Sequence, residues 1–224
     1  MCIRDRMYFA PYGVFALIAK TISSVSGDIS QISSILSALL FYMGVVIAGL
    51  FMHMSITYIS ILKIFTNISL KHFFKSIGPV QLVAFSTSSS GATLPVTMKR
   101  CEKDLGVSEE ISSFVLPLGA TINMDGTALY QGVAAVFIAQ AVGMDLTFAD
   151  QFTIVATAVL ASIGTAAVPG AGIIMLVIIL EAINVPSEGI ALILGVDRIL
   201  DMIRTTTNVT GDATIACAMD SLEK

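Results

Sequence analysis

The stretch DRILDMIRTTTNVTGD, at positions 197 to 212, places charged and amide side chains in an otherwise apolar chain. On a helix that turns by about 100° per residue, four of its polar residues share one narrow face: Asp201, Thr205, Asn208 and Asp212. Arg204 and Arg198 lie at the two edges of that face. A guanidinium in a dry cavity suits bidentate binding of a carboxylate, and Asp201 offers the opposite charge to an ammonium group. The motif therefore predicts a pocket for an acidic amino acid, unless Asp201 and Arg204 only pair with each other at i, i+3.

A second polar motif, NMDGT at 123 to 127, interrupts another apolar segment. Gly126 weakens a helix next to Asp125, so Asn123 and Asp125 bracket an opening that exposes backbone carbonyls. A hard cation such as Na⁺ takes carbonyl, amide and carboxylate oxygens, and unwound backbone inside a membrane supplies them. With Asn208 and Asp212 opposite, the motif favours a cation site over a lone buried aspartate held neutral by a hydrogen bond.

Two further segments are broken by small polar residues, glycine and proline. They are STSSSGATLP at 86 to 95 and SIGTAAVPGAG at 162 to 172. Their tips expose N–H groups and hydroxyls that suit a second substrate carboxylate, as helix ends bind anions elsewhere. Two broken apolar segments in corresponding places indicate a transporter binding site, whereas one alone is equally typical of a kinked helix with a Ser-Gly packing face.

The composition requires that these motifs lie in a membrane. Of 224 residues, 55% are hydrophobic and 12% charged, with a mean hydropathy of +0.88. Soluble domains carry about 25% charged residues, so the deficit excludes a cytosolic enzyme and a nucleic-acid binder, which needs a basic stripe. The three cysteines (Cys2, Cys101 and Cys217) are too few and too dispersed for a metal cluster or a disulfide framework. We expect a multi-pass integral membrane protein in contact with lipid, without a cofactor and without nucleic acid.

Runs without charged residues locate the elements that position the motifs. They predict a helix over 29–65, a first hairpin over 70–101, a broken helix over 107–142, a second hairpin over 148–184 and a final helix over 187–220. Basic residues flank the first hairpin at both ends, from Lys63 to Lys103, and acidic residues flank the second, from Asp145 to Glu188. By the positive-inside bias, the first hairpin enters from the cytoplasm and the second from outside. The expected fold is an all-α membrane protein with two re-entrant helical hairpins and broken transmembrane helices in an inverted repeat.

The start of the chain predicts an incomplete protein. The leader MCIRDR at 1–6 is unlike a signal peptide and is interpreted as foreign sequence. Residues 7–28 are expected to be the end of a scaffold helix, and residues 29–224 a transport domain.

Together the motifs resemble the dicarboxylate/amino acid:cation symporter family of glutamate and neutral amino-acid transporters. The resemblance rests on SSSGATLP, LPLGATINMDGTALYQ, ASIGTAAVPGAG and DRILDMIRTTTNVTGDA, in that order, and it covers the chain from Met7 onward. It implies a non-enzymatic, cation-coupled symporter for glutamate or aspartate. It further implies a homotrimer in a cell membrane, expected to be the bacterial cytoplasmic membrane, with a mobile elevator-type transport domain in each protomer.

The resemblance also implies site residues. The substrate would be held by Ser88 (through its backbone), Ser90, Thr127, Val168, Gly172, Asp201, Arg204, Thr205 and Asn208. One sodium site would use backbone oxygens of Gly119, Asn123 and Asn208 with the Asp212 carboxylate. A second would use Thr121, Ser162, Ile163 and Thr165, and a third Asn123 and Asp125 with ligands from an upstream helix. Coupling to protons in place of sodium stays open.

Two departures from the family pattern bear on the site. Some members carry an arginine in the first hairpin where this chain has Ser88, and Arg198 is a candidate replacement. Ala167 stands where similar transporters often have glycine, which would stiffen the second hairpin.

Two rival functions remain. A C4-dicarboxylate symporter would lack an amino-group contact, and Asp201 argues against it because a second carboxylate repels such a substrate. An intramembrane aspartyl protease would pair Asp125 with Asp201 or Asp212, but Arg204 in the same site would spoil the shared proton.

Overall fold

The computed structural model describes residues 29–223, with side-chain burial from Ser33 onward. Within that range every regular element is helical, so the expected all-α class is confirmed. The elements are α2 (Ile29–His53), η1 (Met54–Tyr58), α3 (Ile59–Phe65), α4 (Leu70–Thr87), α5 (Ser90–Leu105), α6 (Glu109–Ile122), α7 (Asp125–Ala141), α8 (Phe148–Ile163), α9 (Ala171–Ala182), η2 (Ser187–Gly189) and α10 (Ile190–Glu223). The expected leader at 1–6 and scaffold-helix end at 7–28 lie outside the described residues.

Helices α2, η1 and α3 form one continuous run, in which η1 is a five-residue π-helical segment. Within the described residues, this run, Ser33–Phe65, is the one helix long and apolar enough to cross a membrane, with a mean hydropathy of 2.4 over its most apolar 18 residues. Large apolar side chains such as Leu40, Phe41 and Phe51 point outward from it. An outward apolar face of this length suits lipid or another apolar helix.

Helices α4 and α5 form a hairpin whose tip is built by serines. Helix α4 ends where Ser88 adopts a left-handed conformation with φ of 52°. Ser89 then begins α5, because its hydroxyl accepts the N–H of Ala92 at 3.1 Å. A serine oxygen at this position replaces the acceptor that the first turn of a helix lacks. The serine run is therefore the turn itself.

Helices α6 and α7 form one helix with a break in its middle. Asn123 and Met124 have non-helical backbone angles, and α7 resumes at Asp125. The N–H of Asn123 still closes the last turn of α6 by donating to the carbonyl of Gly119 at 2.8 Å. The carbonyls beyond that turn lose their helical partners, which leaves oxygens free for a ligand.

Helices α8 and α9 form the second hairpin. Thr147 and Asp150 begin α8 with a capping box, in which each side chain bonds the backbone N–H of the other residue. The tip between Ile163 and Ala171 is irregular. It ends at Gly170, whose φ of 76° favours glycine.

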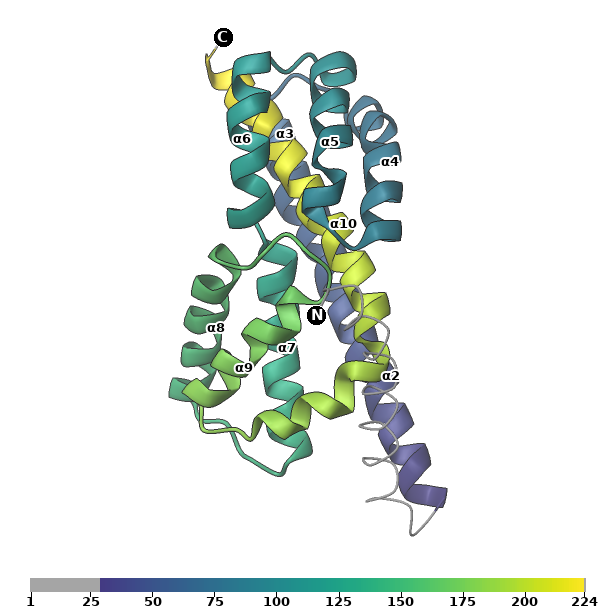
Figure 1. Ribbon diagram of the computed structural model, residues 1–224, viewed down its shortest axis with the longest axis vertical. Helices are drawn as coiled ribbons and strands as arrows, with labels where there is room; N and C mark the ends of the chain where they lie inside the picture. The colour runs from purple at the N-terminus through teal and green to yellow at the C-terminus, as the bar shows by residue number, and fades with distance from the viewer. Residues whose placement is uncertain (1–28, 224) are drawn as a thin grey trace, which may run out of the picture.

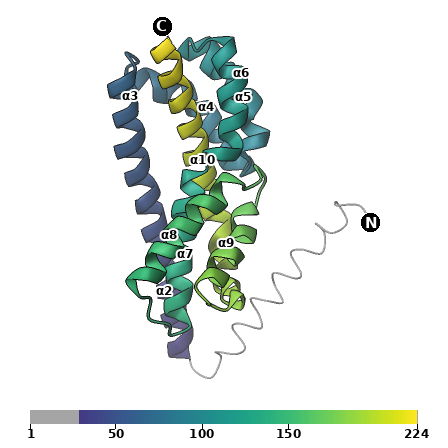
Figure 2. The same ribbon diagram turned by 90° about the vertical axis from the view of Figure 1, so that its left-hand side faces the viewer.

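The two hairpins enter the molecule from opposite ends (Figure 1). Helices α4, α5 and α6 occupy the upper half of this view and α7, α8 and α9 the lower half, while α10 and the α2–α3 run extend through both. Figure 2 shows the α2–α3 run along one side of the bundle. The hairpin tips meet at mid-height, where the N–H of Gly91 donates to the carbonyl of Ala167 at 3.2 Å.

The apolar core is divided in the same way. One buried cluster lies among α2, α7, α8, α9 and the first part of α10, and includes Ile138, Leu176 and Ile193. The other lies among α3 to α6 and the last part of α10, and includes Phe73 and Val209. Each cluster stabilises one half through close van der Waals packing of its apolar side chains. The layer between them is left to buried polar residues, which need partners there.

Candidate functional site

A small cavity lies where the two hairpin tips, the break in α6–α7 and α10 meet. All nine predicted substrate residues line it: Ser88, Ser90, Thr127, Val168, Gly172, Asp201, Arg204, Thr205 and Asn208. Its volume is about 20 Å³, which is room for roughly one water molecule. A ligand of amino-acid size therefore requires the tips or the side chains to move apart.

Arg204 is the dominant charge of the cavity and is only 2% exposed. Its Nε donates to Asp201 Oδ1 at 2.9 Å, and its Cζ lies 4.2 Å from the ring centroid of Tyr130. The i, i+3 pairing of Arg204 with Asp201 is thus present in this conformation. A buried guanidinium needs such partners, because an unpaired charge in a dry site is strongly unfavourable.

One nitrogen of this guanidinium donates no hydrogen bond to the described residues. Within the part of the chain that the structure describes, Arg204 Nη1 is buried and has no hydrogen-bond acceptor. Gly172 of hairpin two lies against it, and a Cβ at that position would be 2.8 Å from Nη1. The site therefore combines an unsatisfied cationic donor with a wall that has no side chain, which suits an incoming carboxylate.

The tip of hairpin two is tied to the same aspartate. The N–H of Gly170 donates to Asp201 Oδ2 at 3.0 Å, so both oxygens of Asp201 already have a partner. Two residues further along hairpin two, the carbonyl of Gly172 accepts a hydrogen bond from the side-chain amide of Gln131 on α7 at 3.0 Å. An ammonium group that binds Asp201 must compete with these donors.

The tip of hairpin one contributes differently from the expectation. Ser88 lines the cavity, and its hydroxyl is buried without a hydrogen-bond partner among the described residues. Ser89, which was not predicted as a site residue, donates its hydroxyl to the carbonyl of Ala167 at 2.7 Å. Ala167, at the position where glycine was expected, thus joins the two tips through its carbonyl. Arg198 is exposed on α10 and does not line the cavity.

Residues of the first predicted sodium site lie together beside the cavity, further along α10. Asn123 donates its amide to Asp212 Oδ1 at 3.0 Å, and Asp212 is 4% exposed. Gly119 packs against the same carboxylate, since a Cβ there would lie 2.7 Å from Asp212 Oδ1. Asn208 bridges to α7, because its Oδ1 accepts the N–H of Gly126 at 2.9 Å. A buried carboxylate beside broken backbone is the donor set that a hard cation takes.

The second predicted sodium set is less closely assembled. The hydroxyls of Thr121, Ser162 and Thr165 each donate to a carbonyl of their own helix or its end. Thr165 and Ser162 are buried, whereas Thr121 and Ile163 are exposed. A cation at this place would have to draw these groups from α6 and hairpin two together.

Asn123 and Asp125, the third predicted set, point to different partners. Asp125 Oδ2 accepts from the hydroxyl of Tyr58 at 2.6 Å and lies 2.6 Å from His53 Nε2. Neither His53 nor Tyr58 was predicted. The sequence could have indicated His53, because it is a polar residue within 29–62, a segment without Lys, Arg, Asp or Glu. No pattern in the sequence indicated Tyr58.

Two more residues near Arg204, Asp197 and Tyr130, were not predicted as site residues. The hydroxyl of Tyr130 donates to Asp197 Oδ1 at 2.6 Å, and Asp197 Oδ1 lies 3.6 Å from Arg204 Nη1. Asp197 could have been found, because it precedes Asp201 by four residues and so shares its helical face.

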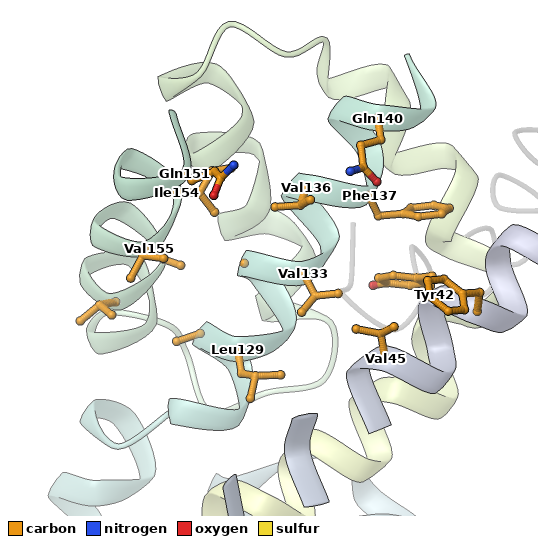
Figure 3. A pocket seen from close by; sticks show the side chains of 15 residues that line it. Tyr42, Val45, Leu129, Val133, Val136, Phe137, Gln140, Gln151, Ile154 and Val155 are labelled. Carbon is orange, nitrogen blue, oxygen red and sulfur yellow. The ribbon is translucent and has the colours of Figure 1, made fainter. Parts of the chain in front are cut away.

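A larger cavity, of about 610 Å³, lies apart from this site between α2, α7 and α8. Figure 3 shows that Val133, Val136, Phe137 and Tyr42 form much of its wall, with Gln140 and Gln151 at one end. Among the described residues, no charged side chain lines it, and it shares no residue with the small cavity.

Comparison with known proteins gives one consistent result. The profile of the sodium:dicarboxylate symporter family matches residues 3–222. An excitatory amino acid transporter of Caenorhabditis elegans is 42% identical over 207 residues, which are 92% of this chain and 40% of that protein. Excitatory amino acid transporter 1 of Rattus norvegicus is 42% identical over 218 residues, 97% of this chain and 39% of the relative. Excitatory amino acid transporter 2 of Homo sapiens is 42% identical over 207 residues, which are 92% of this chain and 35% of that protein. The chain thus spans about 40% of the length of the curated relatives that it matches.

Proposed function

Because the chain belongs to the sodium:dicarboxylate symporter family, we propose that the full-length protein containing it is a sodium-coupled symporter for acidic amino acids. The family consists of membrane transporters and not enzymes, so the aspartyl-protease alternative is removed. In this proposal glutamate or aspartate binds between the hairpin tips, at Arg204 and Asp201.

The observation that carries the proposal is Arg204 Nη1, which has no hydrogen-bond acceptor among the described residues and only an ion-pair contact with Asp197 at 3.6 Å. A buried guanidinium nitrogen without an acceptor is rare, and a carboxylate in the adjoining cavity would satisfy it. Asp201 lies on the same wall and supplies the opposite charge for an ammonium group. The substrate class in this proposal is also that named for the relatives from Caenorhabditis elegans, Rattus norvegicus and Homo sapiens.

The cation part of the proposal rests on Asp212. Its carboxylate, Asn123 and Gly119 would hold one Na⁺ beside the substrate, and Asn208 would contribute to both sites. Because Asn208 is shared, sodium and substrate are expected to bind more tightly together than alone. The sets at Thr121 to Thr165 and at Asn123 and Asp125 are proposed as further sodium sites. Proton coupling is the alternative for these.

The topology part concerns how the substrate crosses the membrane. We assign residues 29–224 to a mobile transport domain and the two hairpins to re-entrant elements that enter from opposite faces. Their opposite entry and meeting tips support an inverted repeat with the site near mid-membrane (Figure 1). A homotrimer in the cell membrane completes the proposal.

The closest alternative is a C4-dicarboxylate symporter, and Asp201 discriminates between the two. Succinate carries the two carboxylates of aspartate without its ammonium group, so Asp201 would repel it unless Arg204 neutralises that charge. The pair Asp201 and Arg204 is therefore the place to test the substrate class.

The test compares Arg204→Cys and Asp201→Asn in the full-length protein, by competition of radiolabelled L-aspartate with L-serine, L-alanine and succinate. Arg204→Cys should lose acidic amino acids and retain small neutral ones, because the ammonium contact survives. The loss should be about thirtyfold or more, since a desolvated charge pair is worth roughly 2 to 5 kcal/mol. Asp201→Asn should lose amino acids and spare succinate. Parallel loss of every ligand in both variants would make the pair structural and the substrate class wrong.

A further inference from the structure

Arg204 has a second carboxylate partner outside the cavity. Asp197 is 6% exposed and lies one helical turn before Asp201 on α10. Its Oδ1 is 3.6 Å from Arg204 Nη1, and neither Asp197 nor Tyr130 lines the cavity. The guanidinium is therefore placed between one aspartate that faces the ligand space and one that does not.

Tyr130 of α7 fixes both Asp197 and Arg204. Its hydroxyl donates to Asp197 Oδ1 at 2.6 Å, and its ring lies under the guanidinium, with Cζ 4.2 Å from the centroid. Tyr130 itself is completely buried. A buried hydrogen bond to a carboxylate and a stacked cation both restrict movement, so Asp197 is held in place by α7, while Asp201 is bonded to the irregular hairpin tip at Gly170.

Asp197 and Asp201 both contact Arg204, but only Asp201 lines the cavity. In this conformation the charge of Asp201 is paired with Arg204, so an ammonium group has to compete with that guanidinium. If Asp201 left without a replacement, Arg204 would be a buried and unpaired cation, which is strongly unfavourable. We propose that Asp197, held by Tyr130, is the fixed counter-ion of Arg204 and that it frees Asp201 to bind the substrate ammonium group.

This inference rests on the proposed function and adds a positioning residue to it. Asp197 does not touch the substrate. It sets the preference between ligands with and without an amino group, because only the former require Asp201 to leave Arg204. Without the Asp197 charge, Arg204 would retain Asp201, and amino acids would lose more affinity than dicarboxylates.

The experiment measures binding of L-aspartate and succinate to the full-length protein, for wild type, Asp197→Asn and Tyr130→Phe. The two ligands differ only in the ammonium group, so the ratio of their dissociation constants reports on Asp201. We expect Asp197→Asn to lower the preference for aspartate by about tenfold or more. Tyr130→Phe keeps the ring under Arg204 and removes only the hydroxyl, so it should shift the ratio in the same direction by less. Asp104→Asn, at a partly exposed ion pair with Arg100 on α5, is the matched control and should leave the ratio unchanged.

An unchanged ratio in Asp197→Asn would overturn the inference. So would an equal loss of both ligands in a variant whose thermal stability is that of wild type, because a merely structural residue would act in this way. If Asp197→Asn does not fold, Tyr130→Phe decides, and an unchanged ratio there counts against the inference. Failure of wild type to bind either ligand would instead contradict the proposed function.

Discussion

At the scale of single residues, the site depends on a glycine as much as on its charges. Gly172 lies where the guanidinium of Arg204 passes the first turn of α9, and a Cβ there would be 2.8 to 3.0 Å from three guanidinium atoms. Arg204 cannot readily give way, because it is 2% exposed and is held by Asp201 and the Tyr130 ring. The guanidinium of Arg204 can therefore occupy this position only because residue 172 has no side chain.

Gly172→Ala is therefore expected to weaken L-aspartate binding by about tenfold, since the displaced guanidinium would no longer meet a carboxylate in bidentate geometry. Calorimetric titration of the full-length protein would measure this. Gly132→Ala is the control, because a Cβ at Gly132 meets nothing within 4 Å. Equal aspartate affinity in the two variants would show that Gly172 does not constrain Arg204.

The residue types and spacing of the site could be read from the sequence, but not all of its partners. Asp201, Arg204 and Asn208 share a helical face, which follows from periodicity alone. Tyr130 and Tyr58 could not be found in this way, because their roles depend on contacts with residues 67 positions away in each case. Periodicity predicts which residues of one helix are neighbours but not which residues of another helix they meet.

At the scale of elements, the π-helical segment η1 places two side chains on one carboxylate. His53 precedes η1 and Tyr58 is its last residue, and both contact Asp125 Oδ2. Single π-helical turns are frequent at functional sites, because they shift the register of one helical face against the next. Here the segment joins the α2–α3 run to the start of α7, beside the break at Asn123.

Tyr58→Phe is expected to destabilise the protein by about 1 to 3 kcal/mol, because a buried hydrogen bond to a carboxylate is lost and the ring is kept. The measurement is the thermal or denaturant unfolding midpoint of the detergent-solubilised full-length protein. Ser113→Ala serves as a control, since that exposed hydroxyl bonds only within its own helix. An unchanged midpoint for Tyr58→Phe would mean that the contact with Asp125 adds nothing to stability.

The elements themselves follow largely from the sequence. Charge-free runs and the Ser, Gly and Pro interruptions predicted two hairpins and a broken helix, and the structure has helix pairs and a break over these ranges. The contact between the tips was not predictable. It is made by the Ser89 hydroxyl and the Ala167 carbonyl, and no pattern in either hairpin indicates which backbone carbonyl the other will reach.

At the scale of the whole molecule, two apolar clusters enclose a polar layer. Each hairpin packs in its own half and contributes its tip to the middle (Figures 1 and 2). This arrangement brings the substrate residues and the Asp212 site to neighbouring turns of α10. It is the arrangement expected if both hairpins are re-entrant, which the loop charges also predict.

Single cysteines at exposed hairpin ends test that topology. Lys71→Cys and Lys103→Cys should react with an impermeant thiol reagent only from the cytoplasm, and Ala149→Cys and Ala182→Cys only from outside. The protein would be the full-length form in intact and inverted vesicles, with its other cysteines replaced. Labelling of positions 149 and 182 from opposite faces would make the second hairpin a simple span and contradict the inverted repeat.

The most direct test of the account is uptake of radiolabelled L-aspartate by the full-length protein in proteoliposomes with an inward sodium gradient. The bond between buried Asp212 and Asn123, beside the Arg204 cavity, predicts that aspartate accumulates above its external concentration. That accumulation should collapse when choline replaces external Na⁺. Uptake that is the same with and without Na⁺, or a protein that does not move aspartate under this gradient, would contradict the account.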